Sequence, residues 1–264
     1  MDRGVVDRDS VRSLFDLTGR VAVVTGGTRG IGRAIVEGFL AEGAHVGFCA
    51  RDAQEVAGTL DALRDRGVLT GATVDVGDAE ALAAWVEESA AAFGGLDVVV
   101  ANVSALAIPD TEENWQASLN VDLMHTVRLV RAAMPHLERS ETASIIAVSS
   151  VSGRESDFAS GPYGTAKTAI IGYVHGLALQ LAGKGIRANT VSPGNIYFEG
   201  GVWASIETGD PDLFRTAVGL NPTGHMGTPE EVAGPVVFLA SPRSRRISGT
   251  NLVVDGALTR GIQL

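Results

Sequence analysis

The sequence predicts a single α/β domain, a doubly wound parallel sheet of about seven strands with helices on both faces. Short apolar runs alternate with stretches of helical periodicity along most of the chain. Several of these runs, such as residues 96–101 (LDVVVA), are almost entirely apolar and suit strands that are buried on both faces. Because strands that alternate with helices are joined by right-handed crossovers, the sheet between the helix layers is expected to be parallel.

Each element follows from the same two patterns. Compact apolar runs predict strands, in chain order, at residues 21–25, 45–49, 73–76, 96–101, 144–148, 187–191 and 252–254. Apolar residues three or four positions apart predict helices at residues 31–42, 53–66, 79–93 and 160–183. Gly94 and Gly95 end the third of these helices, as glycine commonly does.

One domain accounts for nearly the whole chain. Residues 1–16 are expected to be a solvated lead-in and residues 17–264 one folded unit, because no linker rich in Pro, Gly or Ser interrupts them. Residues 195–227 break the alternation, with glycines, prolines and Trp203 around a short helical piece. This excursion predicts a mobile substrate lid, and an ordinary surface insertion is the alternative.

The composition disfavours several classes of function. The formal net charge is −10, so the chain repels nucleic-acid phosphates and anionic membranes. No apolar run reaches the roughly 18 residues of a membrane span, and the polar start of the chain lacks the apolar stretch of a signal peptide. Cys49 is the only cysteine, so no intramolecular disulfide forms. We therefore expect a cytoplasmic protein. We expect no metal site, because no histidine has the spacing of a metal ligand.

A glycine-rich loop, residues 25–32 (TGGTRGIG), lies between the first strand and the first helix. Gly26, Gly30 and Gly32 permit a tight turn, close approach of a pyrophosphate, and close packing of the helix on the strand. The N-terminus of that helix suits an anion. The loop predicts a Rossmann-type dinucleotide site, with a glycine-rich turn that binds nothing as the alternative.

Tyr163 and Lys167 are four positions apart in a helical stretch, so their side chains lie on one helix face. An ordinary phenol has a pKa of about 10, and a neighbouring ammonium favours the phenolate. The pair therefore predicts a general acid for reduction or a general base for oxidation. Ser150 follows a buried strand at the carboxyl end, where its hydroxyl would stabilise charge on a substrate oxygen.

Four features in this order and spacing resemble the short-chain dehydrogenase/reductase family: the glycine loop, Ser150, the motif Tyr163-Gly-Thr-Ala-Lys167 and the step Ser192-Pro-Gly194. The resemblance implies hydride transfer between NADP(H) and a carbonyl or secondary alcohol, most closely that of 3-oxoacyl thioester reductases. It also implies that Lys167 holds the nicotinamide ribose and that Asn120 holds a water linked to the lysine. A homotetramer is implied, built on helices around residues 112–139 and 161–183 and on the C-terminal tail.

Two arginines favour NADP(H) over NAD(H). The family's NAD-selecting acid falls at Ala50, whereas Arg29 and Arg51 would pair with a 2′-phosphate. Asp52 is the contrary observation, since it would reach back to the ribose. The cofactor-binding residues expected from the loop and the resemblance are Gly26, Thr28, Arg29, Gly30, Ile31, Gly32, Arg51, Asp75, Val76, Asn102, Tyr163, Lys167, Pro193, Gly194 and Ile196.

The chain departs from the family pattern in two places. Residues 101–104 are Ala-Asn-Val-Ser where the family has Asn-Asn-Ala-Gly, and no threonine follows Gly194. We expect the backbone of Ile196 to serve in place of that threonine. Two alternatives remain open at this point: a hydroxysteroid or polyketide-type ketone dehydrogenase that uses NAD(H), and a dinucleotide-binding sensor without turnover.

Overall fold

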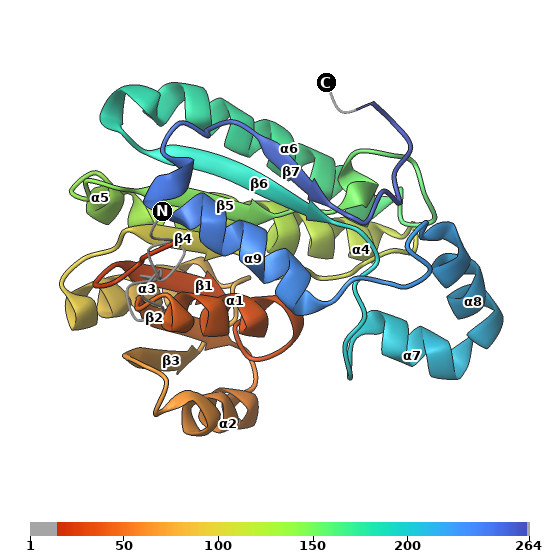
Figure 1. Cartoon of the computed structure of the whole chain (residues 1–264), viewed down its shortest axis with the longest axis horizontal. Helices are drawn as coiled ribbons and strands as arrows, with labels where there is room; N and C mark the ends of the chain where they lie inside the picture. The colour runs from red at the N-terminus through yellow and green to blue at the C-terminus, as the bar shows by residue number, and fades with distance from the viewer. Residues whose placement is uncertain (1–14, 263–264) are drawn as a thin grey trace, which may run out of the picture.

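The computed structural model describes residues 15–262 and contains a seven-stranded parallel sheet (Figure 1). The strands lie in the order β3-β2-β1-β4-β5-β6-β7. This order reverses between β1 and β4, so ligands are expected at the carboxyl ends of these strands. The predicted fold is confirmed. The strand bounds are β1 Val21–Thr25, β2 His45–Ala50, β3 Leu69–Thr73, β4 Val98–Ala101, β5 Ser144–Val148, β6 Arg187–Pro193 and β7 Asn251–Val254.

The third strand is displaced from its predicted place. It was expected at residues 73–76, but the paired residues are Leu69–Thr73, with Leu69 in register with Val46. The paired segment, LTGAT, carries little apolar surface. Val74 and Val76 are buried beyond the end of the strand, so their hydrophobicity indicates burial and not pairing.

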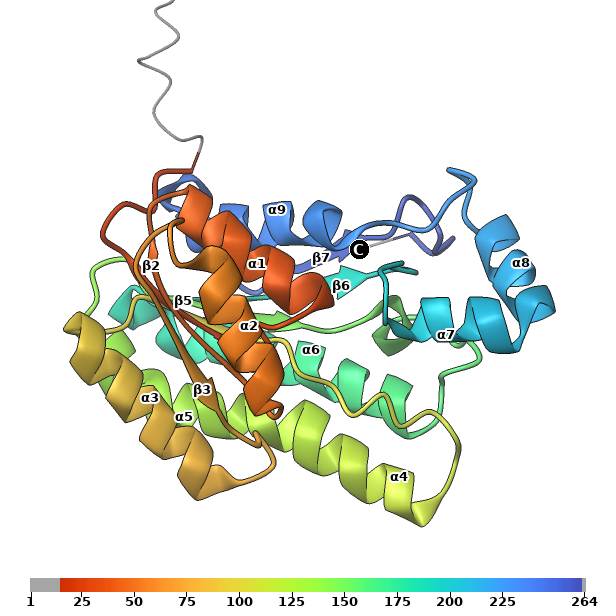
Figure 2. The same ribbon diagram turned by 90° about the horizontal axis from the view of Figure 1, so that it is seen from below.

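Two helix layers cover the sheet, as Figure 2 shows. One layer comprises α1 (Gly30–Ala41), α2 (Ala53–Leu63) and α9 (Pro229–Ala240), and the other comprises α3 (Ala79–Phe93), α5 (His125–Leu137) and α6 (Pro162–Leu181). The core has two parts, one on each face of the sheet. Alternate residues of β1 enter the two parts, Val23 on one face and Val24 on the other. This alternation explains why every residue of the strand is apolar or buried.

A π-helical turn joins two helices of the second layer. The short helix α4 (Glu112–Ala117) leads into the π-helical residues Ser118–Met124, which continue into α5. Ser118 and Asp122 are the buried residues of this turn. Such π-helical turns are uncommon and occur frequently at functional sites.

The segment of residues 195–227 holds two helices where one short helical piece was expected. These are α7 (Val202–Gly209) and α8 (Pro211–Leu220), and they lie together beyond one end of the sheet (Figures 1 and 2). Asp210 ends α7 and caps α8, because its side chain accepts from the N–H of Leu213. The two helices pack on a small apolar cluster of their own, Trp203, Ala217 and Met226.

Of the expected lead-in, residues 1–14 lie outside the described residues. The backbone N–H groups of Phe15 and Asp16 both donate to Glu42 Oε2 at 3.0 Å. The ring of Phe15 packs against that of Phe238, with centroids 5.9 Å apart. The described end of the lead-in is therefore attached to the domain. Among the described residues, no helix is both long and apolar enough to cross a membrane.

Candidate active site

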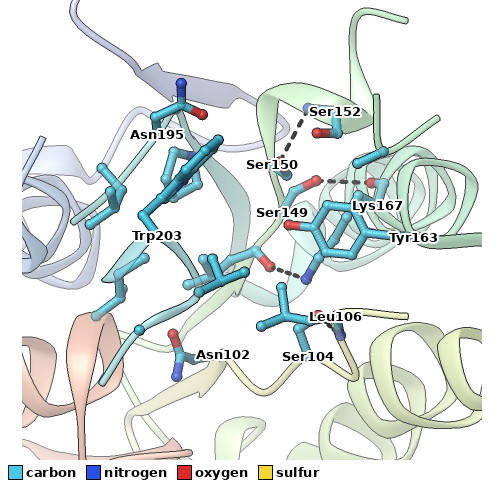
Figure 3. Close-up of a pocket in the computed structure, with 18 of the residues that line it drawn as sticks. Asn102, Ser104, Leu106, Ser149, Ser150, Ser152, Tyr163, Lys167, Asn195 and Trp203 are labelled. Carbon is cyan, nitrogen blue, oxygen red and sulfur yellow. Dashed lines mark hydrogen bonds between the residues drawn. The ribbon is translucent and has the colours of Figure 1, made fainter. Parts of the chain in front are cut away.

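A cavity of about 790 Å³ opens at the carboxyl ends of the central strands. Figure 3 shows Tyr163, Lys167 and Ser150 on one side of it and Trp203 and Asn195 on the opposite side. Nearly all of the predicted cofactor and catalytic residues line this cavity, Gly30, Asp75 and Asn120 being the exceptions. The structure therefore brings the glycine loop and the Tyr-Lys pair into one site.

The glycine loop folds as its residue types require. Gly26 has a φ of +71°, and a Cβ at Gly32 would lie only 2.0 Å from the Gly26 carbonyl oxygen. Asn102 fastens the loop to the end of β4, because its side-chain amide donates to Thr25 O at 3.0 Å. Gly30 lies under the ring of Phe198, which would be 2.5 Å from a Cβ at that position. The loop thus presents its backbone to the cavity while an aromatic ring from residues 195–227 covers it.

The adenosine end of the cavity holds both predicted arginines and an unexpected acid. Asp52, the observation against NADP(H), caps α2 by accepting from the N–H groups of Gln54 and Glu55. Glu55 also lines the cavity, and its Oε2 accepts from the hydroxyl of Thr28 at 2.7 Å. Arg51 lines the cavity and is exposed. Glu55 was not predicted as a site residue, because an acid in the first turn of a helix is common.

Arg29 contacts the segment of residues 195–227. Its guanidinium donates to the carbonyl of Gly200 at 3.5 Å, a long bond at the exposed edge of the cavity. Together with the packing of Phe198 on Gly30, this contact joins the phosphate loop to that segment. Arg29 is therefore positioned both by its own loop and by the segment above it.

Two predicted residues, Asp75 and Asn120, have hydrogen-bond partners of their own. The Asp75 carboxylate accepts from the N–H of Gly77 at 2.9 Å. Asn120 Oδ1 accepts from Arg128 at 2.7 Å, and Arg128 also donates to the carbonyl of Gly77. Neither residue lines the cavity. The expected water-mediated link from Asn120 to Lys167 stays a prediction.

Ser150 is held by a short turn that packs directly on α6. Its Oγ accepts from the N–H of Ser152 at 3.1 Å, so its own proton remains for another acceptor. The turn reaches α6 at Gly153, where a Cβ would lie 2.8 Å from the carbonyl carbon of Lys167. Gly164 allows the same approach from the α6 side, where a Cβ would lie 2.9 Å from Ser152 O. Backbone contact thus sets Ser150 relative to Tyr163 and Lys167.

Lys167 is buried, and its ammonium interacts with two groups of the protein. Its side chain is 2% exposed, and its Nζ lies 5.5 Å from the centroid of the Tyr163 ring. Nζ donates to the carbonyl of Val148 at 3.2 Å and pairs with Asp122 Oδ1 at 3.1 Å. The Asp122 side chain is 0% exposed. Asp122 was not predicted, although a buried ammonium requires an anionic or strongly polar partner nearby.

Ser149, the residue before Ser150, has a structural role. Its hydroxyl donates to the carbonyl of Lys167 at 2.9 Å (Figure 3). This bond fastens the end of β5 to α6. The choice of Ser150 over Ser149 as the substrate contact agrees with this arrangement, because Ser149 is already committed to the helix.

A buried histidine lies behind the glycine loop. Burial lowers the pKa of His125 to about 4. Its Nδ1 donates to Val121 O at 3.1 Å, so its Nε2 accepts from the Thr25 hydroxyl at 3.0 Å. Thr25 Oγ1 in turn accepts from the N–H of Asn102. This chain of bonds joins α5 to the ends of β1 and β4 beside Ala101, where the family pattern has an asparagine.

The last predicted cofactor residues follow β6. Pro193, Gly194 and Ile196 all line the cavity. Ile196 pairs with Gly227 in an isolated bridge, and the bonds of that bridge run from Tyr197 N to Gly227 O and from Gly227 N to Asn195 O. Among residues 15–262, the N–H of Ile196 has no backbone acceptor. Its expected contact with the cofactor stays a prediction.

Comparisons with known proteins show which family the chain belongs to. Residues 26–259 match the family described as enoyl-(acyl carrier protein) reductase. Isoepoxydon dehydrogenase patN of Penicillium expansum is 40% identical over 254 residues, which cover 94% of this chain and 97% of that protein. The chain belongs to the short-chain dehydrogenase/reductase family. It is therefore an oxidoreductase that acts between alcohol and carbonyl and uses a nicotinamide dinucleotide.

Two further relatives support the assignment. The 3-oxoacyl-acyl-carrier-protein reductase FabG of Vibrio cholerae serotype O1 is 33% identical over 249 residues, 92% of this chain and 99% of that protein. The NADPH-bound structure of a short chain oxidoreductase from Pseudomonas aeruginosa PAO1 superposes with a TM-score of 0.87 at 32% identity. It covers 94% of this chain and 100% of that one, and it is described as containing an atypical catalytic center.

Proposed function

We propose that this short-chain dehydrogenase/reductase is an NADP(H)-dependent ketone reductase, reversible as an alcohol dehydrogenase, with Ser150, Tyr163 and Lys167 as its catalytic residues. The observation that carries the proposal is that these three side chains line the same cavity as the glycine loop. The residues present suit a dinucleotide, because the loop leaves a cradle without side chains where Gly26 and Gly32 approach each other. The bound nicotinamide supplies the hydride.

In the direction of reduction, the substrate carbonyl oxygen accepts a hydrogen bond from Ser150. The Ser150 proton is available for this bond because its oxygen already accepts from Ser152. As the carbonyl carbon receives the hydride, charge grows on the oxygen, and Tyr163 donates its proton there. An ammonium has three N–H groups, one of which Lys167 donates to Val148, and its charge pairs with Asp122. The ammonium therefore keeps N–H groups with which to hold the ribose of the nicotinamide and to stabilise the phenolate.

The preference for NADP(H) rests on Arg29 and Arg51 at the adenosine end. Asp52 lines the same cavity, but its Oδ1 already caps α2, which weakens the argument for NAD(H). Two guanidinium groups stabilise a dianionic 2′-phosphate and gain little from a neutral diol. Glu55 acts against the phosphate, so cofactor choice depends on the balance of these charges.

Residues 195–227 are proposed to form the substrate lid. The apolar residues Trp203, Ile206 and Leu220 line the cavity from this segment, and Trp203 lies opposite Tyr163 (Figure 3). Phe158 makes an edge-to-face contact with Trp203, with centroids 6.0 Å apart. The lid therefore favours an apolar ketone. Relatives named for isoepoxydon and for 3-oxoacyl thioesters make both kinds of ketone candidate substrates.

We also propose a homotetramer in the cytoplasm. Large apolar side chains are exposed on the helices that the family resemblance assigns to the interface, including Leu119 and Leu179. Leu179 is 83% exposed, which is costly for a side chain that remains in water. Sedimentation equilibrium tests this, and Leu179→Glu should shift the assembly to smaller species.

The experiment for the activity follows NADPH oxidation with a panel of ketones that includes 3-oxoacyl thioesters and cyclic hydroxyketones. We expect turnover with NADPH, and a rate reduced about 10²- to 10⁴-fold in Tyr163→Phe. Arg51→Ala should weaken NADPH binding and leave NADH binding nearly unchanged. Tight NADPH binding without turnover on any ketone would instead indicate a dinucleotide sensor.

A further inference from the structure

The ring of Phe198 lies directly against the backbone of the glycine loop. A Cβ at Gly30 would be 2.5–2.9 Å from three atoms of this ring, so the ring rests on the bare Cα of the glycine. Phe198 lines the cavity, whereas Gly30 does not. The ring therefore separates this glycine from the cavity, and any side chain at position 30 would displace it.

A tight turn directs the ring toward the loop. The N–H of Gly201 donates to the carbonyl of Phe198 at 3.0 Å, and Gly200 has a φ of +73°, which favours glycine. A Cβ at Gly201 would lie 2.9 Å from Cε1 of the Phe198 ring. The two glycines therefore let the chain turn sharply while the ring folds back beside its own turn.

The N-terminus of α1, beside the ring, offers backbone donors. The N–H groups of Gly30, Ile31 and Gly32 have no backbone acceptor among residues 15–262, and no side chain caps this helix. A helix N-terminus that follows a glycine loop is where the pyrophosphate of a dinucleotide binds. The ring of Phe198 thus covers the first residue of this anion site.

The segment of residues 195–227 has few other attachments on this side of the cavity. The bridge between Ile196 and Gly227 ties its base to itself, and α7 and α8 pack mainly on each other beyond one end of the sheet (Figure 2). At the glycine loop, the segment is held by the Phe198 ring and by the long hydrogen bond from Arg29. The ring is the larger of these two contacts.

We propose that Phe198 is a cofactor-binding residue that closes over the pyrophosphate of the dinucleotide and controls its entry and release. This inference rests on the proposed function of the same cavity. It adds a second role to the segment proposed as the substrate lid, because the side of that segment next to the glycine loop retains the cofactor.

The contact with Gly30 distinguishes this role from that of an ordinary binding residue. A side chain that contacts only the cofactor slows its release and leaves its association unchanged. The Phe198 ring packs on the protein's own backbone, so it holds the segment closed whether or not the cofactor is bound. Loss of the ring should therefore raise the rate constants of both association and release, and change the Kd less than either.

The test measures NADPH binding by stopped-flow nicotinamide fluorescence, with release followed by displacement with excess NADP⁺. It compares wild type, Phe198→Ala and Phe198→Tyr, with Phe214→Ala as the matched control. Phe214 lies on α8 of the same segment, contacts Tyr197 with ring centroids 5.9 Å apart, and does not line the cavity. Its replacement removes an equal ring from the segment without touching the glycine loop.

Both rate constants are expected to rise about 5- to 10-fold in Phe198→Ala, because the segment loses the burial of one half-buried ring. Phe198→Tyr keeps the ring and should stay within about twofold of wild type. Unchanged rate constants in Phe198→Ala, a rise in the release rate constant alone, or an equal rise in Phe214→Ala would overturn the proposal.

These measurements contain no ketone, so they separate this inference from the proposed function. A chain that binds NADPH but reduces no ketone would overturn the proposed function and leave this comparison valid. A chain that reduces ketones, with NADPH kinetics unaffected by Phe198→Ala, would overturn this inference alone. Wild type that binds neither NADPH nor NADH would overturn both, and if only NADH binds, the same comparison is made with NADH.

Circular dichroism and thermal unfolding show whether Phe198→Ala keeps its fold. If it does not, Phe198→Leu takes its place, because leucine keeps an apolar side chain at the turn but lacks the ring that covers Gly30. Faster association and release in Phe198→Leu are then expected, and rate constants equal to those of wild type would overturn the proposal.

Discussion

Gly153 packs against the backbone of Lys167, so closely that a Cβ there would lie 2.8 Å from the lysine's carbonyl carbon. This contact joins the turn that carries Ser150 to the helix that carries the Tyr-Lys pair. The distance between Ser150 and Tyr163 is therefore set by two backbones in contact and not by flexible side chains. A change at Gly153 should disturb the chemistry without touching a catalytic side chain.

Gly153→Ala is expected to lower kcat by about 10-fold or more, because misplacement by a fraction of an ångström is costly in a catalytic site. Initial rates with a saturating ketone measure the effect. Gly58→Ala is the control, since Gly58 lies within α2 with nothing within 4 Å of its Cβ position. That control should keep its activity and gain about 0.5–1 kcal/mol of stability. Equal activity in Gly153→Ala and wild type would show that the contact does not set the site.

His125 should make the protein sensitive to acid. The unfolded chain binds a proton at this histidine below its ordinary pKa of 6.5, but the folded protein does so only near pH 4. The folded state is thus disfavoured as the pH falls from 6.5 to 4, by about 3 kcal/mol in total. Denaturant unfolding at several pH values measures this slope. In His125→Asn the free energy of unfolding should fall at neutral pH, and its dependence on pH between 4 and 6.5 should become weaker. An unchanged pH dependence in this variant would mean that other groups cause it.

Glu55 should limit the affinity for NADPH. Its carboxylate lines the adenosine end of the cavity, and at an exposed site one charge is worth about 1 kcal/mol. Glu55→Gln is therefore expected to tighten NADPH binding about fivefold and to leave NADH binding unchanged or weaker. Titration by nicotinamide fluorescence measures both. Glu80 occupies the corresponding first turn of α3, and Glu80→Gln should change neither affinity.

Arg187 should contribute to stability and not to catalysis. Its buried guanidinium donates to the carbonyls of Leu239 and Ala240 at the end of α9 and to the hydroxyl of Ser244. Burial lowers its pKa to about 10. Arg187→Met should cost about 3 kcal/mol, because it leaves helix-end carbonyls without a charged donor. Thermal unfolding tests this, with Arg245→Met at an exposed arginine as the control. A small loss of unfolding free energy in Arg187→Met would mean that water replaces the guanidinium as donor to these carbonyls.

The sequence was most informative where one physical cause dominates a segment. Largely apolar runs such as residues 144–148 (SIIAV) predicted β5 to the residue, because a strand buried on both faces has few polar positions. The third strand was misplaced because Leu69–Thr73 forms its bonds with few apolar side chains, while the valines beyond it are buried without pairing. Hydrophobicity reports burial, and backbone pairing is only correlated with it.

The residues of the candidate site were also predictable only in part. Tyr163 and Lys167 were predictable because a helix brings residues four apart together. Asp122 was not, because a π-helical turn alters which residues of a helix face inward, and periodicity assumes a regular helix. Phe198 was assigned to a lid but not to Gly30, because only the folded chain brings residues so distant in sequence together.

The central claim is that Tyr163 and Ser150 reduce a carbonyl with hydride from a nicotinamide held by this glycine loop. Deuterium transfer tests it most directly, using NADPH labelled at the hydride position and mass spectrometry of the alcohol product. We expect one deuterium at the carbinol carbon with wild type, and transfer slowed about 10²- to 10⁴-fold in Tyr163→Phe. Label that stays on the nicotinamide with every ketone, or equal transfer by Tyr163→Phe and wild type, would contradict it.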